Sequence, residues 1–578
     1  MPAEHRNCLT LALGCCLLAC SHQRFDLSGS SNPFDNPAGA GALQSPLPPP
    51  PELDPGAESG LIQTLDLGRL GTLIKPPNPP PAISGGTLGV TPDGSVAVVA
   101  DPDRDAVYLV EPATQRVRTV MLPIGSEPGR VVLDDQRRAH IALRSGNALA
   151  RVAIDTAGLE LVREICQLPR GLAYAPASLW VACADGELVQ LAPDSYAERS
   201  RRFVARDLRD VFVSNRGVPF VSLYRAASLL AVEPAGSIVA SDIPAQSILL
   251  GSELFSSLSL GSAAVAWRTI QAPDGVAWML HQLDQDRPIS ISGVGYGAGC
   301  DAIVRPALTL FDADAKPAAT LRLPSSLGIA VDLALSANGQ WLAFADPSAY
   351  LAEKPTLQLL STPRFLADSE RQGLATSLCE NAPTAIELVS DGQATSVAFD
   401  RAGLLYVFSR EPAQLYVFDP TRILAVLTDP DWVFHPLYTI RLADTSVRDT
   451  GHELFHTITA SGLSCASCHP EARDDGRVRT FLDLGPRRTQ NLRGGMLDTL
   501  PLHWGGEFAD FDQLVADVWN QRMRGGPLSD AQRAALGQWI QWQPALKLKA
   551  ADAAASARGG RLFESLSWTA PHATPGSP

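Results

Sequence analysis

A repeat of roughly 40 residues runs through residues 83–444 and constrains the fold more than any other feature of the sequence. In its clearest copy, Gly86–Ala100, an alternating strand leads through a Pro-Asp-Gly turn into a second strand, and Ala106–Val110 follows as a third. Further copies begin near residues 129, 171, 211, 265, 331 and 396. This period is typical of propeller blades, whereas a pair of β-sandwiches, the alternative, seldom sustains it. The sequence therefore predicts an all-β propeller of seven blades.

The N-terminal residues carry an export pattern. Arg6 precedes an apolar run from Cys8 to Ala19 that is too short to span a bilayer. The run ends in Leu17-Leu18-Ala19-Cys20, which resembles a bacterial lipobox, although an ordinary signal peptide cut elsewhere is the alternative. We therefore expect residues 1–19 to be a lipoprotein signal peptide and Cys20 to be lipidated. The protein would then be a periplasm-facing membrane lipoprotein in the outer membrane of a Gram-negative bacterium.

Composition divides the remainder of the 578 residues into domains. Residues 20–82 are rich in Pro, Gly and Ser, which favours an extended linker without a core. Residues 83–444 resemble the YVTN-type propellers of exported bacterial proteins. From residue 445 to residue 550 the apolar spacing becomes helical, so a small all-α domain is expected to follow the propeller. The formal net charge of −14 argues against nucleic acid as a partner, because its binders need a basic face.

The motif Cys465-Ala466-Ser467-Cys468-His469 occurs once in the chain. Two thiols one helical turn apart can form thioethers with the vinyl groups of a haem, and the adjacent histidine can then bind the iron on its proximal side. A thioredoxin-like dithiol would need a βαβ setting, which the pattern lacks. A zinc site would need further ligands, from His452, His456 or His503. The predicted cofactor is one covalently bound haem c.

Four cysteines remain outside the N-terminal segment and the motif. An even remainder in an oxidising compartment predicts two disulfides, for which three connectivities are possible. We expect Cys166 to pair with Cys183 and Cys300 to pair with Cys379, because the members of each pair lie within or between neighbouring repeats.

Three helical segments are predicted around this motif. Gly451–His456 has the pattern of a short helix, and Ser529–Gln532 has the pattern of a capping box that opens another. The spacing of an apolar stripe indicates a third helix, formed by Phe511, Leu514, Val515, Val518 and Trp519. Helices this short need a central cofactor to pack against, which favours a cytochrome c domain.

Residues 445–545 resemble the N-terminal haem domain of bacterial di-haem cytochrome c peroxidases. The shared features are Gly451-x-x-Leu454-Phe455, the cysteine motif, Asp475-Gly476, Gly485–Gly494 and Leu502–Glu507. The resemblance implies that Arg487, Arg488 and Asn491 lie near the haem edge or its propionates, with a surface position as the alternative for the two arginines. It also implies that Trp504 conducts electrons, with ordinary packing as the alternative for this residue.

The chain departs from that family at its distal ligands. The family places a catalytic Glu before a Met, where this chain has Arg522 before Met523, so the proton carrier for peroxide cleavage is missing. The sixth iron ligand is open between Met523, Met496, His503 and water. Met523 is favoured, because a thioether ligand raises the haem potential and suits electron transfer. Helix-end packing is the alternative role for Met523.

Residues 551–578 contain an echo of the first haem domain. Gly559–Phe563 is similar to Gly451–Phe455, yet no cysteine follows Cys468. We therefore expect residues 551–578 to be the remnant of a second haem domain followed by a disordered tail.

These features predict an exported, lipid-anchored electron-transfer protein. Its haem domain would exchange electrons with a redox partner protein or a small electron donor, and the propeller would supply a docking surface or a ligand pocket. It would touch the membrane only through its N-terminal lipid. A peroxidase-like haem oxidoreductase is one alternative, so enzymatic activity is left open. A propeller binding scaffold with a vestigial haem is the other.

Overall fold

The computed structural model describes residues 70–545 and 552–565 apart from several short stretches. These stretches are residues 235, 251–256, 292–294, 298–300, 324–326, 349–355, 373–384, 388–391, 423–433 and 483. The predicted signal peptide, the lipidation site Cys20, the Cys300–Cys379 pair and the tail beyond residue 565 lie outside the described residues.

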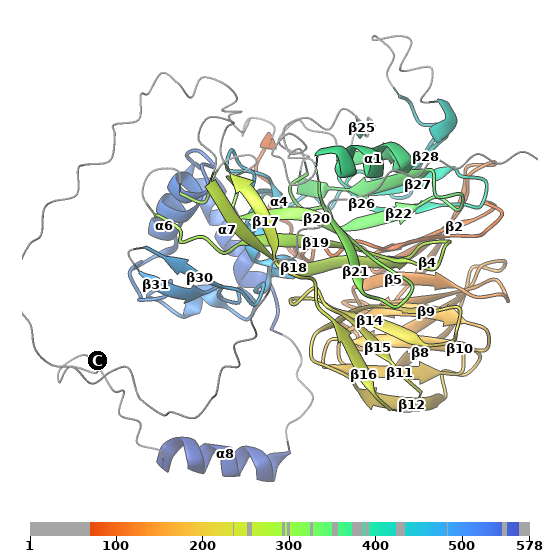
Figure 1. The fold of residues 1–578 in the computed structure, drawn as a ribbon, viewed down its shortest axis with the longest axis horizontal. Helices are drawn as coiled ribbons and strands as arrows, with labels where there is room; N and C mark the ends of the chain where they lie inside the picture. The colour runs from red at the N-terminus through yellow and green to blue at the C-terminus, as the bar shows by residue number, and fades with distance from the viewer. Residues whose placement is uncertain are drawn as a thin grey trace, which may run out of the picture. The chain divides into compact units, whose positions relative to one another are not determined.

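The first four blades of the propeller each contain four antiparallel strands (Figure 1). Blade 1 contains β1 (Leu88–Val90), β2 (Ala97–Asp101), β3 (Ala106–Glu111) and β4 (Arg116–Met121). Blade 2 contains β5 (Pro128–Leu133), β6 (Arg138–Leu143), β7 (Ala148–Ala153) and β8 (Gly158–Glu164). Blade 3 contains β9 (Pro169–Ala175), β10 (Ser178–Cys183), β11 (Glu187–Leu191) and β12 (Glu198–Phe203). Blade 4 contains β13 (Leu208–Val213), β14 (Pro219–Leu223), β15 (Leu229–Val232) and β16 (Ile238–Ser241).

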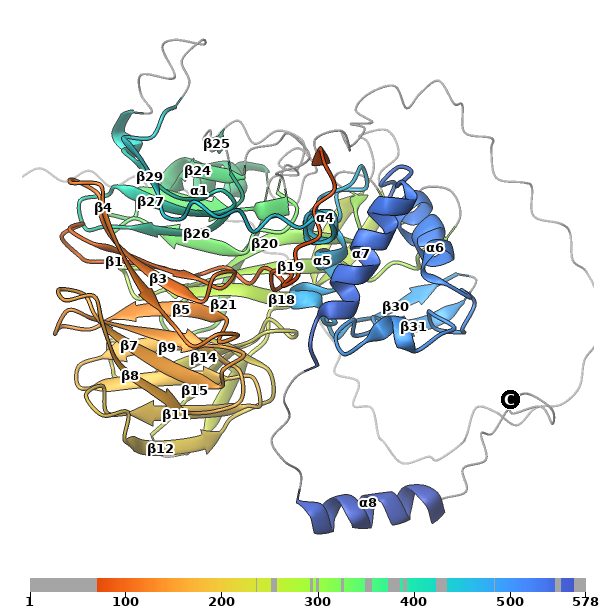
Figure 2. The ribbon, with the colours of Figure 1, turned by 180° about the vertical axis from the view of Figure 1, so that it is seen from behind.

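The remaining three blades include one sheet of five strands (Figure 2). Blade 5 contains β17 (Gln246–Leu250), β18 (Ser257–Gln271), β19 (Ala277–Gln285), β20 (Val304–Phe311) and β21 (Pro317–Arg322). Blade 6 contains β22 (Asp332–Leu335), β23 (Trp341–Ala345), β24 (Leu357–Ser361) and β25 (Ala385–Glu387), with α1 (Thr362–Gln372) after β24. Blade 7 contains β26 (Ala394–Phe399), β27 (Leu405–Arg410), β28 (Ala413–Phe418) and β29 (Tyr438–Arg441), with the short helix η4 (Pro420–Arg422) after β28.

Contacts between the innermost strands close the ring of blades. Strand β5 contacts β1 and β9, β13 contacts β9 and β18, and β22 contacts β18 and β26. Strand β26 of the last blade also contacts β1 of the first. The seven-bladed propeller predicted from the repeat is confirmed by this order of sheets in the described residues.

Strand β2 shows why these strands are apolar on both faces. Val98 and Ala100 pack toward blade 2, whereas Ala97 and Val99 pack toward blade 7. All four side chains are fully buried, because the strand is covered by a neighbouring blade on each side. Burying one valine side chain contributes about 1.5–3 kcal/mol, so the contacts between blades hold the ring together.

Blade 5 extends beyond the other blades toward the C-terminal region. The 15-residue strand β18 pairs with β17 over its first part and with β19 along most of its length, across a bulge between Ala264 and Arg268. Asp284 near the end of β19 accepts hydrogen bonds from Arg477 (2.9 Å) and Arg479 (2.8 Å). The chain after β19 therefore reaches the C-terminal region, where Ile289 forms a β-bridge with Phe481.

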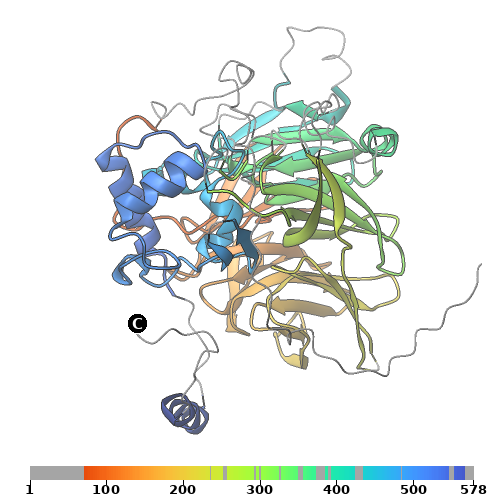
Figure 3. The same cartoon turned by 60° about the vertical axis from the view of Figure 1, so that its left-hand side comes forward.

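The C-terminal region contains short helices and one small sheet (Figure 3). The helices are α4 (Thr450–His456), α5 (Cys465–Cys468), η5 (Pro470–Ala472), η6 (Met496–Asp498), α6 (Phe511–Leu514), η7 (Val515–Arg522), α7 (Asp530–Trp542) and α8 (Ala553–Ser565). The expected all-α architecture is corrected by an antiparallel hairpin formed by β30 (Val478–Phe481) and β31 (Gly485–Arg488). In β30 the buried residues alternate with exposed ones, but one of the buried residues is Arg479, so the pattern did not read as a half-buried strand.

Two of the predicted helices are confirmed, one of them with its capping residue. Ser529 caps α7 as the sequence predicted, and its partner Gln532 completes the capping box. Helix α4 covers Gly451–His456, and it packs closely on α7 because a Cβ at Gly451 would lie 2.2 Å from the carbonyl oxygen of Ala535.

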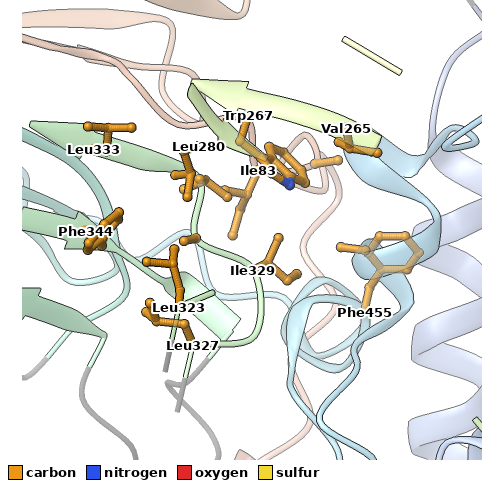
Figure 4. Packing of buried hydrophobic residues seen from close by; sticks show 14 of the residues in the cluster. Ile83, Val265, Trp267, Leu280, Leu323, Leu327, Ile329, Leu333, Phe344 and Phe455 are labelled. Carbon is orange, nitrogen blue, oxygen red and sulfur yellow. The ribbon is translucent and has the colours of Figure 1, made fainter. Parts of the chain in front are cut away.

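Residues 70–82, which the composition assigned to the linker, pack on the C-terminal helices. The main-chain N–H of Ile74 donates to the Thr450 hydroxyl (3.0 Å), and the Trp539 indole N–H donates to the carbonyl of Pro80 (2.9 Å). Figure 4 shows Ile83 and Phe455 in the apolar cluster that also contains Trp267 of the propeller. The extended proline-rich chain here is held by tertiary contacts, which composition does not reveal.

Two further findings concern the cysteines and the helices. Cys166 and Cys183 are joined by a disulfide, as the spacing suggested. Among the described residues, no helix has the length and apolar character needed to cross a bilayer.

Candidate functional site

The cysteine motif lies on the wall of a cavity of about 360 Å³ in the C-terminal region. This volume is in the range expected for small-molecule and cofactor sites. Helices α4, α5, α6, η7 and α7 supply much of the wall, and the connection between β19 and β20 of blade 5 adds Tyr296 and Ile303. Its apolar lining includes Phe455, Leu463, Phe481, Leu492, Val515, Val518, Trp519, Leu536 and Ile540. The propeller and the helices therefore build one apolar site together.

Helix α5 presents both motif cysteines to the cavity. Ser464 begins the helix, and its main-chain N–H donates to the Ser467 hydroxyl at 3.0 Å, which fixes the single turn. Both Cys465 and Cys468 line the cavity as free thiols. Burial raises the pKa of each thiol to about 12. A redox-active dithiol needs a lowered pKa, so this environment argues against thioredoxin-like chemistry.

The imidazole of His469 has the form that an iron ligand requires. Its Nδ1 lies 3.0 Å from the carbonyl oxygen of Arg473. A carbonyl can only accept, so Nδ1 carries the hydrogen and Nε2 keeps its lone pair. Burial also lowers the pKa of His469, which keeps the ring neutral. Metal-binding histidines commonly have their second nitrogen held in this way.

Of the three histidines considered for a zinc site, His456 is engaged elsewhere. His456 uses both ring nitrogens, toward the carbonyl of His452 (2.8 Å) and the main-chain N–H of Ile83 (3.2 Å). Within the described part of the chain, no group of three or more His, Cys, Asp or Glu side chains could hold a metal ion.

All three candidate side chains for the sixth iron ligand line the cavity. Met523 is buried at the end of the wide helix η7, in a cluster with Leu463 and Phe481. Met496 packs against the larger apolar cluster. His503 has its Nδ1 paired with a carboxylate oxygen of Glu507, which leaves Nε2 free to act as a ligand or to carry a proton.

The structure separates the residues predicted at the haem edge. Arg487 and Asn491 line the cavity, but Arg488 does not. Strand β31 turns successive side chains to opposite faces, so Arg488 is exposed and pairs with Asp474 at 3.3 Å. Arg488 is therefore exposed and off the cavity wall, and its position near a haem edge stays a prediction.

Trp504 lies on the cavity wall, with its indole N–H donating to the carbonyl of Arg488 (2.8 Å). Its ring centroid is 3.8 Å from that of His503 and 4.8 Å from that of Phe481. The structure thus places this side chain in an aromatic group on the wall, which is compatible with packing and with electron conduction alike.

Several residues of the site were not found from the sequence. Arg479 lines the cavity while its guanidinium pairs with Asp284 of blade 5 and, at 2.6 Å, with Asp475. Tyr296 and Ile303 come from an insert in the propeller. No local pattern could identify them, since they reach the site only through contacts between distant segments.

No protein family model matches the sequence. A comparison with curated proteins also gives no match. Among solved structures, hydrazine synthase of Kuenenia stuttgartiensis is similar with a TM-score of 0.47 and 17% identity, over 60% of this chain and 97% of that chain. A streptogramin B lyase has a TM-score of 0.40 and 9% identity, over 57% of this chain and 92% of that one. A catalytically inactive virginiamycin B lyase from Staphylococcus aureus has a TM-score of 0.38 and 10% identity, over 59% of this chain and 95% of that one. At these TM-scores the similarities say nothing about function, and the propeller assignment depends on the sheet order alone.

Proposed function

We propose that this chain binds one haem c covalently and transfers single electrons. Cys465 and Cys468 would form the thioethers, and Nε2 of His469 would bind the iron. The single observation that carries the proposal is that both thiols and the His469 imidazole, whose Nδ1 lies 3.0 Å from the carbonyl oxygen of Arg473, line one apolar cavity. When bound, the haem would supply an iron centre that gains and loses one electron.

The cavity wall suits that role. Phe455, Trp519 and Leu536 are buried and present apolar surface to the site, which lowers the effective dielectric constant there. The lining residues include no Asp or Glu, so no carboxylate faces the cofactor directly among the described residues. Met523 stays our preferred sixth ligand, because its thioether is buried on the same cavity and would favour electron transfer.

The setting of the protein follows from the export pattern. Lipidation at Cys20 would tether it to a membrane facing the periplasm, where a redox partner protein or a small donor would meet the haem domain. The Cys166–Cys183 disulfide supports an oxidising compartment, because disulfides persist there and are rare in reducing ones.

A second candidate is peroxidase-like oxidation, and one observation favours it. The His503–Glu507 pair places an imidazole on the cavity with its second nitrogen held by a carboxylate. Such a pair could carry the proton that the missing family glutamate would otherwise carry. Peroxide turnover that disappears in a His503→Ala variant would favour this function over simple electron transfer.

Haem attachment tests the proposal directly. The full chain is produced in a bacterial host that matures c-type cytochromes, and covalent haem is measured by the mass of the denatured protein. We expect one haem in the wild type and none in Cys465→Ser/Cys468→Ser. The matched control Cys166→Ser/Cys183→Ser removes two other cysteines and should retain the haem. A colourless wild type without added mass would refute the proposal.

The sixth ligand is tested on the same material. A Met-ligated ferric haem has a weak far-red absorption band, which we expect to disappear in Met523→Ala and to persist in Met496→Ala. An unchanged spectrum of Met523→Ala would exclude Met523 as the ligand.

A further inference from the structure

Glu471 lies two residues after His469 and is almost completely buried, with 1% of its surface exposed. Its backbone has φ +54°, and the next residue, Ala472, has φ +57°. Positive φ values are unfavourable for residues other than glycine and persist only where the surroundings impose them. Glu471 is therefore a buried carboxylate in a strained loop. Because a buried charge has lost its solvation by water, it needs oppositely charged or hydrogen-bonding partners.

Three arginines of the propeller supply those partners. Oε1 of Glu471 accepts from Arg209 (2.6 Å) and Arg144 (3.1 Å), and Oε2 accepts from Arg170 (3.2 Å). Arg144 follows β6, Arg170 lies in β9 and Arg209 lies in β13, so three successive blades contribute one guanidinium each. The hydroxyl of Ser84, just before blade 1, donates to Oε1 as a fourth contact, at 2.6 Å. We call Arg144, Arg170 and Arg209 the arginine cage.

Two arginines of the cage each pair with a second carboxylate besides Glu471. Arg144 also pairs with Glu127, and Arg170 also pairs with Asp207. With Glu471 included, three buried or largely buried guanidinium groups face three carboxylates. Loss of Glu471 would leave the cage with an excess of buried positive charge.

The loop that carries Glu471 also carries the hydrogen-bond acceptor for His469. That acceptor is the carbonyl oxygen of Arg473, and only Pro470, Glu471 and Ala472 separate the two residues. Glu471 and Ala472 have positive φ values, so this segment is not a regular helix. Regular helical geometry therefore does not set the distance between Nδ1 of His469 and the carbonyl oxygen of Arg473. The main chain of Glu471 is held as well, because the guanidinium of Arg493, on the cavity wall, donates to its carbonyl at 2.9 Å.

We propose that Glu471 is a positioning residue through which the propeller orients His469. The arginine cage fixes the Glu471 side chain, the fixed loop places the Arg473 carbonyl, and that carbonyl holds Nδ1 of the imidazole. The propeller would thus act on the iron ligand as well as providing a surface. This inference rests on the proposed haem attachment for its effect on the iron, but the restraint on the loop is independent of haem.

Two measurements on Glu471→Gln test the proposal. The first is hydrogen–deuterium exchange of the segment 465–476 in the Cys465→Ser/Cys468→Ser background, which needs no haem. The second is the reduction potential of the haem in the otherwise wild-type protein. The matched control is Glu127→Gln, which also removes one carboxylate that pairs with the arginine cage. Glu127 accepts hydrogen bonds from Arg144 and Ser145, which lie outside the loop 470–473.

We expect Glu471→Gln to speed exchange in segment 465–476 and to raise the potential, because a weaker hydrogen bond to His469 makes the imidazole a poorer donor. Glu127→Gln should leave the exchange unchanged and shift the potential less. Equal shifts in the two variants, or unchanged exchange in Glu471→Gln, would overturn the proposal. If Glu471→Gln fails to accumulate, Glu471→Asp keeps the charge, shortens the side chain and should change both readouts in the same direction. A wild type without haem, but with slow exchange that Glu471→Gln speeds up, would refute the proposed function and leave the positioning role standing.

Discussion

Acid is expected to destabilise the C-terminal region through His456 of α4. Its Nδ1 donates to the carbonyl of His452 (2.8 Å), and its Nε2 accepts from the main-chain N–H of Ile83 (3.2 Å). Only the neutral ring can make both hydrogen bonds. Protonation would place an N–H at Nε2 directly against the N–H of Ile83, at a site with no solvent to compensate.

The size of the effect follows from the shift in pKa. Burial lowers the pKa of His456 from 6.5 to about 3. The unfolded chain therefore binds more protons than the folded one below about pH 6.5, so stability falls as the pH falls through this window. Each pH unit within it costs about 1.4 kcal/mol, which amounts to about 2 kcal/mol at about pH 5. Burial also lowers the pKa of His452, which adds to the loss in the same direction.

Urea unfolding at about pH 7.5 and about pH 5 measures the effect. Compared with the wild type, His456→Gln should lose about 2 kcal/mol less stability between the two pH values, even if it is less stable at the higher one. The same substitution at exposed His435 should follow the wild type at both pH values. A His456→Gln variant with the pH dependence of the wild type would refute the reasoning.

Two substitutions test the packing directly. Gly451→Ala should destabilise the protein by about 1–3 kcal/mol in thermal unfolding, because its Cβ would lie 2.2 Å from the carbonyl oxygen of Ala535. Gly559→Ala in α8, with no atom within 4 Å of its Cβ, should be neutral or stabilising, and equal losses in the two variants would contradict this explanation. Cys166→Ser/Cys183→Ser opens a loop with a sequence separation of 17 and should lower the free energy of unfolding by about 3 kcal/mol in urea titrations. A loss too small to measure would show that the disulfide does not restrain the unfolded chain.

Much of the fold could be predicted because its signals are local. The blades are encoded by turns and alternating strands within each repeat, and the resulting count of seven agrees with the sheets. The capping box at Ser529 also depends on neighbours in sequence, and it was found for that reason. Helix α8 covers Gly559–Phe563, where the sequence echoes α4, but its side chains are exposed, and its origin in a second haem domain stays a prediction.

Several features of the site could not be predicted from patterns of neighbouring residues in the sequence. The role of Arg487 or Arg488 depends on which face of β31 meets the cavity, and the sequence carries two equal arginines there. The hairpin containing β31 was missed because a buried arginine breaks the usual alternation of strand β30. Residues 70–82 read as a linker because prolines rarely build a core, yet here they lie against α4 and α7.

The sequence by itself determined the repeat architecture and the order of the regions, and it identified the residues predicted to attach haem, because each of these signals depends on neighbours a few positions apart. Only the tertiary structure brought Glu471 into the arginine cage and joined Tyr296 to the cavity wall. Those contacts connect segments hundreds of residues apart, and a buried charge is stabilised by partners that the chain supplies from a distance. Burial, and with it the electrostatic environment of the motif, arises only when the propeller and the C-terminal helices pack together.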